Sequence, residues 1–256
     1  MRPQNPRPIE RYFQIIEIVA ASHDGLTLAE ISQIANLPKP SAHRLVKALQ
    51  ELGILVSDET WYKKFRIGSY MRRILQLCVE PEKETAFAQM TVDRLAAELG
   101  ETTYVVRMDH DSIRSIARSA PDQGHRLHVL PGDLLPAHAA ASAKAILAFQ
   151  DEATVARFLQ PPLEVLTSRT KTDVAEVMAE FAQIRETGFA VCDREIDENI
   201  LAFACPVHIG AIGVIHALGV TGPVTRLGRQ DQTRLIERMK QAAATLGAML
   251  GTLKGG

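Results

Sequence analysis

Residues 27–56 read TLAEISQIANLPKPSAHRLVKALQELGILV, and this stretch decides the fold of the N-terminal part of the chain. Thr27 with Glu30 three residues later forms a capping box, a common helix start that here leads into apolar residues at helical spacing. Pro38 disfavours helix in the residue before it, whereas Pro40 is tolerated in a first helical turn. The stretch therefore predicts two short helices joined by a tight turn.

The surrounding residues complete a small unit with its own core. In the second helix an apolar face is predicted from the spacing of Ala42, Leu45, Val46 and Leu49. Residues 12–20 repeat this stripe and predict a third helix upstream. Gly53 is a natural helix cap, and residues 54–56 and 61–67 read as two strands of a hairpin across residues 57–60. We therefore expect a winged helix-turn-helix over residues 1–68.

The polar face of the second helix and the hairpin are both basic. Residues 1–76 hold 11 Lys and Arg against 7 Asp and Glu, a formal charge of +4, and the remainder carries −5. An ordinary pair of packed helices would not need a basic free face, a tight turn and a basic hairpin together, so we interpret the unit as DNA-binding. The predicted DNA contacts are Lys39, Pro40, Ser41, Ala42, His43, Arg44 and Lys47 of the helix, with Lys63, Lys64 and Arg66 of the hairpin. Ser41, Ala42 and His43 are expected to face base edges, while Arg2 and Arg7 are expected at a minor groove.

The rest of the chain alternates helical and strand-like patterns. Residues 69–81 predict a linker helix, which is either a plain connector or a subunit-pairing element. A helix then carries Phe87, Met90, Leu95 and Leu99. Strands are expected at residues 103–108, 113–117, 189–192, 202–208 and 212–220, and helices at 139–149, 151–159, 173–187 and 230–253. This order predicts an α+β domain over residues 82–256, with helices around a largely antiparallel sheet.

Composition and motifs argue against a membrane protein and against an enzyme. No stretch approaches a membrane span, and residues 1–10 lack the apolar core of a signal peptide. Three cysteines at unrelated spacings fit reduced thiols, so we expect a cytoplasmic protein. Common catalytic and phosphate-loop motifs are missing, and His138, Ser142 and Lys144 share one helix start without an identifiable carboxylate partner. We expect no catalytic residues, cofactor or metal.

The chain resembles the IclR family of bacterial transcriptional regulators. The resemblance rests on LPKPSAHRLVKALQELGIL and FRIG in the N-terminal part, and further on LPAHAAASAKAILA (135–148), RETGFAVCDREID (185–197), ACPV and GVTGPVTRL. It covers nearly the whole chain. It implies a GAF-like C-terminal domain that binds a small effector and takes part in oligomerisation, and it implies subunit pairing through the N-terminal region.

An effector pocket is expected near residues 137–145. This run is almost free of bulky side chains, so the N–H groups of the helix start could approach a carboxylate, although small residues also serve helix packing. The resemblance places the pocket on Ala141, Ser142, Cys192, Asp193, Ile200, Ala202, Gly219 and Thr221. Cys192, Asn199 and Ala202 depart from the usual family residues and reduce polar anchoring. Glu195 matches a frequent family glutamate, and we interpret it as bonding neighbouring backbone. The expected effector is a small carboxylate or an aromatic acid.

The sequence therefore predicts a sequence-specific regulator that acts as a homodimer or a dimer of dimers on a palindromic operator, under control of a small molecule. It favours neither repression nor activation. One alternative is a small-molecule sensor or enzyme that uses its winged helix for protein contacts, which would bind no DNA in a salt-dependent way. Another is constitutive DNA binding with a vestigial pocket.

Overall fold

The computed structural model of the chain describes residues 7–22, 24–57, 63–68, 70–71, 74, 81–120 and 131–253. The chain divides into two compact units, Met1–Cys78 and Val79–Gly256. Most of the linker helix predicted over residues 69–81 lies outside the described residues, as do Arg2 and the turn of the predicted hairpin.

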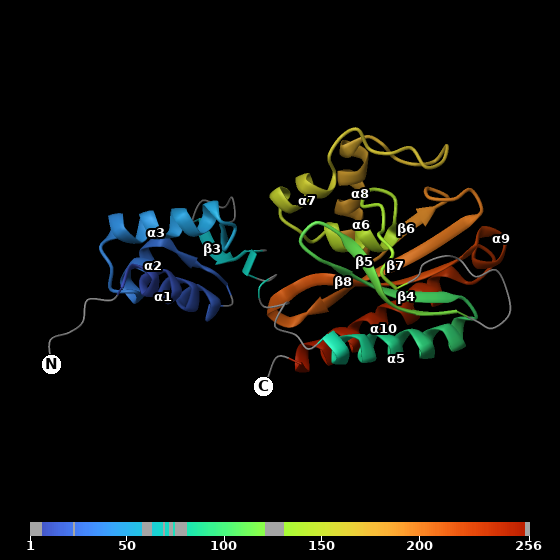
Figure 1. Cartoon of the computed structure of the whole chain (residues 1–256), viewed down its shortest axis with the longest axis horizontal. Helices are drawn as coiled ribbons and strands as arrows, with labels where there is room; N and C mark the ends of the chain where they lie inside the picture. The colour runs from blue at the N-terminus through green and yellow to red at the C-terminus, as the bar shows by residue number, and fades with distance from the viewer. Residues whose placement is uncertain are drawn as a thin grey trace. The chain divides into compact units, whose positions relative to one another are not determined.

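In its described residues, the N-terminal unit packs helices on a small sheet (Figure 1). Its elements are α1 (Pro8–Ala20), β1 (Leu26–Thr27), α2 (Leu28–Ile34), α3 (Lys39–Glu51), β2 (Leu55–Ser57) and β3 (Lys64–Ile67). The sheet order is β1-β3-β2, antiparallel throughout. The core consists of Ile15, Val19, Ile31, Leu45, Val46, Leu49, Leu55 and Phe65. Strand β1 was not predicted, because two residues are too few to show an alternating pattern.

The predicted start and end signals operate in this unit. The Thr27 backbone N–H donates to Glu30 Oε2 at 2.7 Å, and the Glu30 N–H donates to Thr27 Oγ1 at 3.3 Å, so the capping box at α2 is formed. Gly53 follows α3 with a φ of 67°, the left-handed conformation that a glycine adopts without strain after a helix. The start of α2 and the end of α3 are therefore set by interactions between residues that are close in the sequence.

The C-terminal unit is an α+β domain built on one five-stranded sheet, as the sequence predicted. Its helices are α5 (Pro81–Leu99), α6 (Ala141–Leu147), α7 (Glu152–Phe158), α8 (Val174–Thr187), α9 (Val224–Leu227) and α10 (Gln232–Thr252), with a 3-10 turn at Gly210–Ile212. Its strands are β4 (Thr102–Met108), β5 (Ile113–Ser119), β6 (Ala190–Asp193), β7 (Ile200–Ile209) and β8 (Gly213–Pro223). The strand order is β5-β4-β8-β7-β6, and all neighbours are antiparallel.

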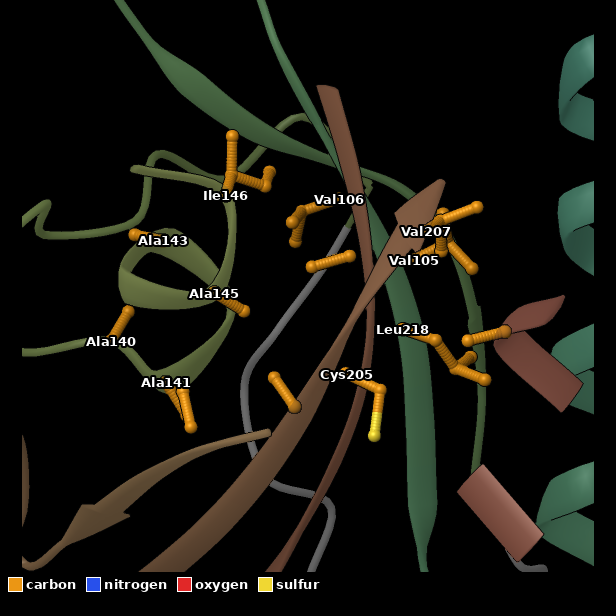
Figure 2. Packing of buried hydrophobic residues seen from close by; sticks show 14 of the residues in the cluster. Val105, Val106, Ala140, Ala141, Ala143, Ala145, Ile146, Cys205, Val207 and Leu218 are labelled. Carbon is orange, nitrogen blue, oxygen red and sulfur yellow. The ribbon is translucent and has the colours of Figure 1, made fainter. Parts of the chain in front are cut away.

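Helices cover both faces of this sheet (Figure 1). The long helices α5 and α10 lie side by side on one face, and α6 lies on the other with α8 outside it. Figure 2 shows Ala141 and Ala145 of α6 on one side of the strands and Val105 and Val207 on the side of α5 and α10. The sheet is therefore the middle layer of a three-layer core.

Two details of the helices differ from the sequence prediction. Met90 of α5 is 55% exposed instead of buried, because the buried stripe runs through Ala88, Val92 and Leu95. Helix α6 begins two residues later than expected, at Ala141, and is seven residues long. No helix within the described ranges has the length and apolar character needed to cross a membrane.

Candidate functional site

Helix α3, the predicted recognition helix, presents a basic face. Of the predicted contacts on this helix, Lys39, Pro40, His43, Arg44 and Lys47 are exposed and Ser41 is half-buried. Lys47 Nζ lies 3.9 Å from Oε1 of Glu51, which is also exposed. Ala42, in contrast, is 0% exposed, so the prediction that it faces base edges is wrong. It belongs to the buried stripe with Leu45 and Leu49, because residues three and four apart share one face of a helix.

The end of the hairpin adds further basic side chains. Lys63 and Arg66 are exposed and Lys64 is half-buried, whereas Phe65 turns into the core. Side chains alternate along a strand, so Lys64 and Arg66 share the outer face of β3. Arg66 Nη2 donates to the Asp24 backbone oxygen at 3.2 Å, which leaves other guanidinium N–H groups for a phosphate. The hairpin thus supplies the positive charge that the sequence predicted.

In the C-terminal unit, strand register brings predicted effector residues side by side. Cys192 of β6 pairs with Ala202 of β7, which pairs with Thr221 of β8. Gly219 lies two residues before Thr221 and therefore on the same face, in the next row of the sheet. These four residues, which come from strands β6, β7 and β8, therefore lie on one face of the sheet in neighbouring rows.

Helix α6 begins over this face with Ala141 and Ser142, which are 1% and 0% exposed. Ser142 Oγ is buried and has no hydrogen-bond partner among the described residues. Tyr104 of β4, which the sequence analysis missed, packs its ring against Gly219. A Cβ at position 219 would lie 2.3 Å from Tyr104 Cζ, so this position accepts only glycine while the ring stays in place.

The hydroxyl of Tyr104 comes close to Ser142, but not in a geometry that satisfies the serine. Burial raises the pKa of Tyr104 to about 12, while the adjacent Ser142 works in the opposite direction. The phenol is therefore neutral and able to donate a hydrogen bond. Two buried hydroxyls thus lie between α6 and the sheet.

A buried ion cluster supports the start of α6. Lys144 is 0% exposed, and its Nζ lies 2.7 Å from Glu195 Oε1 and 2.9 Å from Glu180 Oε2. Lys171 also contacts Glu180. The interpretation that the Glu195 carboxylate bonds neighbouring backbone is therefore wrong, because Oε1 pairs with a lysine of α6 and Oε2 has no hydrogen-bond partner among the described residues. Sequence spacing did not reveal this pair, since 51 positions separate its members.

Within this cluster, burial disfavours the charged form of Glu195. Burial raises the pKa of Glu195, and the positive charge of Lys144 only partly counteracts it. Glu195 Oε2 is buried without a hydrogen-bond partner in the part of the chain that is described. Burial and the nearby Glu195 charge also raise the pKa of the Cys192 thiol. The thiol is therefore a neutral, weakly polar group at neutral pH.

Two predicted effector residues remain, Asp193 and Ile200, and only Asp193 lies on the other face of the sheet. Asp193 alternates to the opposite face from Cys192, and its carboxylate pairs with Arg194 and Arg169, each at 2.8 Å. Hydrogen bonding to Arg194 holds the pKa of Asp193 below its ordinary value. Asp193 therefore does not share the face of the buried row, and its role in effector binding stays a prediction. Ile200, the first residue of β7, is half-buried opposite Pro223; it lies two residues before Ala202 and therefore on the same face as the row.

His138 does not join Ser142 and Lys144 in a cluster. Its Nε2 lies 2.9 Å from the backbone oxygen of Glu164, on the loop that follows α7. Among the described residues, no group of three His, Cys, Asp or Glu side chains is placed to hold a metal ion.

Comparison with known families covers both units. A family model described as "IclR helix-turn-helix domain" matches residues 8–59, and one described as "Bacterial transcriptional regulator IclR C-terminal" matches residues 84–248. The chain is 28% identical over 234 residues to the probable transcriptional regulator SauR of Cupriavidus necator, covering 91% of this chain and 92% of that protein. It is 27% identical over 235 residues to the Pca regulon regulatory protein of Pseudomonas putida, covering 90% and 78%.

Solved structures share the fold over almost the whole chain. The IclR protein of Thermotoga maritima matches with a TM-score of 0.62 at 19% identity, covering 95% of this chain and 98% of that one. An IclR homologue from Microbacterium hydrocarbonoxydans, solved in complex with 4-hydroxybenzoate, matches with a TM-score of 0.62 at 20% identity, covering 95% and 99%. These families and relatives are transcriptional regulators and not enzymes, which confirms the expectation that this chain is not an enzyme. The chain belongs to the IclR family of bacterial transcriptional regulators.

Proposed function

We propose that this regulator binds an operator through α3 and the basic outer face of β3, and that a small acid bound between α6 and the sheet controls that binding. The observation that carries the DNA half is the exposed basic face of α3 above a buried apolar stripe. A helix of this kind fits the major groove, where Arg44 and Lys47 reach guanines or phosphates and His43 reaches base edges.

The second part of the proposal, the effector site, rests on a buried polar group that has no hydrogen-bond partner among the described residues. Ser142 Oγ lacks a partner, which is unfavourable in a buried position unless a ligand or water completes it. Tyr104 supplies a second donor, and Lys144 balances the Glu195 charge, so the site can accept an anion. The homologue in complex with 4-hydroxybenzoate supports a small aromatic acid as the ligand class.

The proposed assembly is a homodimer or a dimer of dimers on a palindromic operator. Two identical heads would read two half-sites at a fixed spacing. Effector binding would change the relative placement of the heads and so change the affinity for both half-sites together.

The test is fluorescence anisotropy with labelled DNA from the region upstream of the protein's own gene, with random DNA alongside, at several salt concentrations. Specific binding that weakens steeply with salt is expected, because basic side chains release counterions from phosphates. A protein that uses its winged helix for protein contacts would bind neither DNA in a salt-dependent way, and that result would reject the DNA half.

The effector half is tested with 4-hydroxybenzoate as the first probe and Ser142→Ala as the variant. At a ligand concentration of 100 times Kd, binding should stabilise the wild type by about 2.7 kcal/mol, measured as a shift in thermal unfolding. Ser142→Ala removes an unsatisfied buried hydroxyl, so its stability without ligand should equal or exceed that of the wild type, while its ligand-induced shift should shrink. An unchanged shift would mean that Ser142 does not contact the ligand.

A further inference from the structure

A cavity lies beside the part of β7 that strand β6 does not cover. Strand β6 pairs only with Leu201–Ala204, so among the described strands none pairs with that side of β7 at residues 205–209. A cavity of about 720 Å³ opens there, between this part of β7, the ends of α6 and α8, and helix α10. Its volume falls in the range of small-molecule sites, roughly 300–1,000 Å³.

The floor of the cavity is apolar and made mostly by α10. Gly247 approaches β7 so closely that a Cβ would lie 2.3 Å from the His208 backbone oxygen. This contact brings α10 against the strand, and the cavity is bounded by the neighbouring Ala244 and Ala248. Phe149, at the end of α6, forms a wall and packs edge-on against the His208 ring with centroids 5.1 Å apart. The cavity can therefore take an apolar ligand body.

The rim of the cavity is basic. Lys240, Arg185 and His208 line it against a single acid, Glu186. Lys240 Nζ donates to the Thr187 backbone oxygen at 2.6 Å, and Arg185 Nη1 donates to the Ala148 backbone oxygen at 2.8 Å. No carboxylate within the described ranges pairs with either cation, and each keeps further N–H groups.

We propose that this cavity binds an amphipathic carboxylate, a straight-chain aliphatic acid of medium length, independently of the effector site. The apolar floor takes the chain, and the ammonium of Lys240 with the guanidinium of Arg185 takes the carboxylate. The charge of the rim selects an acid over an alcohol of the same length. The site shares no lining residue with the row formed by Cys192, Ala202 and Thr221.

The test is calorimetric titration of the full chain with octanoate, with octan-1-ol as the uncharged comparison. Saturable binding of octanoate with one site per chain is expected, and binding of octan-1-ol should be at least about tenfold weaker because a charge-assisted contact is missing. Equal binding of both compounds, or no binding of octanoate, would overturn the proposal.

Variants locate the ligand. Lys240→Gln should weaken octanoate binding about tenfold or more, and Ala248→Leu, at an exposed helix position that lines the cavity, should abolish it. Arg234→Gln is the matched control, because it removes an exposed cation from the same helix outside this cavity. Ser142→Ala should also leave octanoate binding unchanged. Loss in Ser142→Ala with retention in Lys240→Gln would place octanoate in the effector site and overturn the second site.

The same variants separate a ligand site from a subunit contact. If a second copy of the chain covers this cavity, Ala248→Leu will change the sedimentation of the protein, and the wild type will not bind octanoate. That pair of results would contradict the proposal without bearing on DNA binding or on 4-hydroxybenzoate.

Discussion

The buried lysine of α6 is the least expected residue of the C-terminal unit. Lys144 has no exposed surface and depends on Glu195 and Glu180 for its charge balance. Removing one partner of a buried ion pair typically costs about 3–5 kcal/mol, because it leaves an uncompensated charge, whereas replacing both can be nearly neutral. We therefore expect the pair to specify the position of α6 more than to stabilise the fold.

A double-mutant cycle tests this view. Lys144→Met should destabilise the C-terminal unit by roughly 3–5 kcal/mol, Glu195→Gln should cost less because Glu180 still pairs with Lys144, and the double variant should cost clearly less than the sum. The measurement is urea unfolding followed by far-ultraviolet circular dichroism. Additive losses would show that the two side chains stabilise the unit independently.

A second buried carboxylate gives a prediction on pH. Glu84, in the first turn of α5, has Oε1 at 2.6 Å from His216 Nε2 and Oε2 at 2.6 Å from Arg107 Nη1. Burial acts to raise the pKa of Glu84, but its bond to His216 and the charges of His216 and Arg107 outweigh burial and leave it below the ordinary value of 4.5. A lowered folded pKa contributes stability above pH 4.5 that is lost as the pH falls through the folded value.

Glu84→Gln should therefore lose less stability than the wild type as the pH falls below 4.5, because the variant lacks this carboxylate. Denaturant midpoints from about pH 6 to about pH 3 measure the effect. Glu82→Gln, an exposed carboxylate of the same helical turn, is the control. An acid profile of Glu84→Gln that overlays the wild type would contradict the assignment.

At the scale of elements, helix α3 carries the predicted DNA contacts on its exposed face and its packing residues on its buried face. Arg44→Ala should weaken operator binding by about 1–3 kcal/mol if Arg44 contacts a guanine, and leave the unfolding of the unit unchanged, because its side chain is exposed. Ala42→Lys adds a positive charge to the same helix, yet it should unfold the unit, because position 42 is buried. Anisotropy and circular dichroism measure the two effects, and undiminished DNA affinity in Arg44→Ala would remove this face from the interface.

The elements also show what the sequence could and could not predict. Caps such as Thr27 with Glu30 act between neighbours in the chain, so the positions of α2 and α3 were readable from local chemistry. The stripe of α5 was misplaced at Met90, because which helix face is covered depends on the sheet beneath it. The ion pair of Lys144 with Glu195 and the packing of Tyr104 on Gly219 join distant segments, and no local signal carries them.

At the scale of the whole chain, charge is divided between the two units. The formal charge of residues 1–76 is +4 and that of the remainder is −5, so we expect phosphate attraction to come from the N-terminal unit. Lys63→Gln should therefore reduce the slope of log affinity against log salt by about 1, for specific and random DNA alike. Arg229→Gln, an exposed cation of the acidic unit, should leave the slope unchanged. A reduced slope in Arg229→Gln would show that the C-terminal unit also contacts DNA.

The paired strands β4 and β8 contribute side chains to both faces of the sheet in the C-terminal unit. Tyr104 and Gly219 face α6, whereas Arg107 and His216, further along the same strands, face α5 and hold Glu84. We therefore expect a backbone shift beside Tyr104, if a ligand binds there, to move Arg107 and His216 as well and with them their partner Glu84 in the first turn of α5. Because α5 follows the DNA-binding unit in the chain, this contact is where we expect ligand binding to affect that unit.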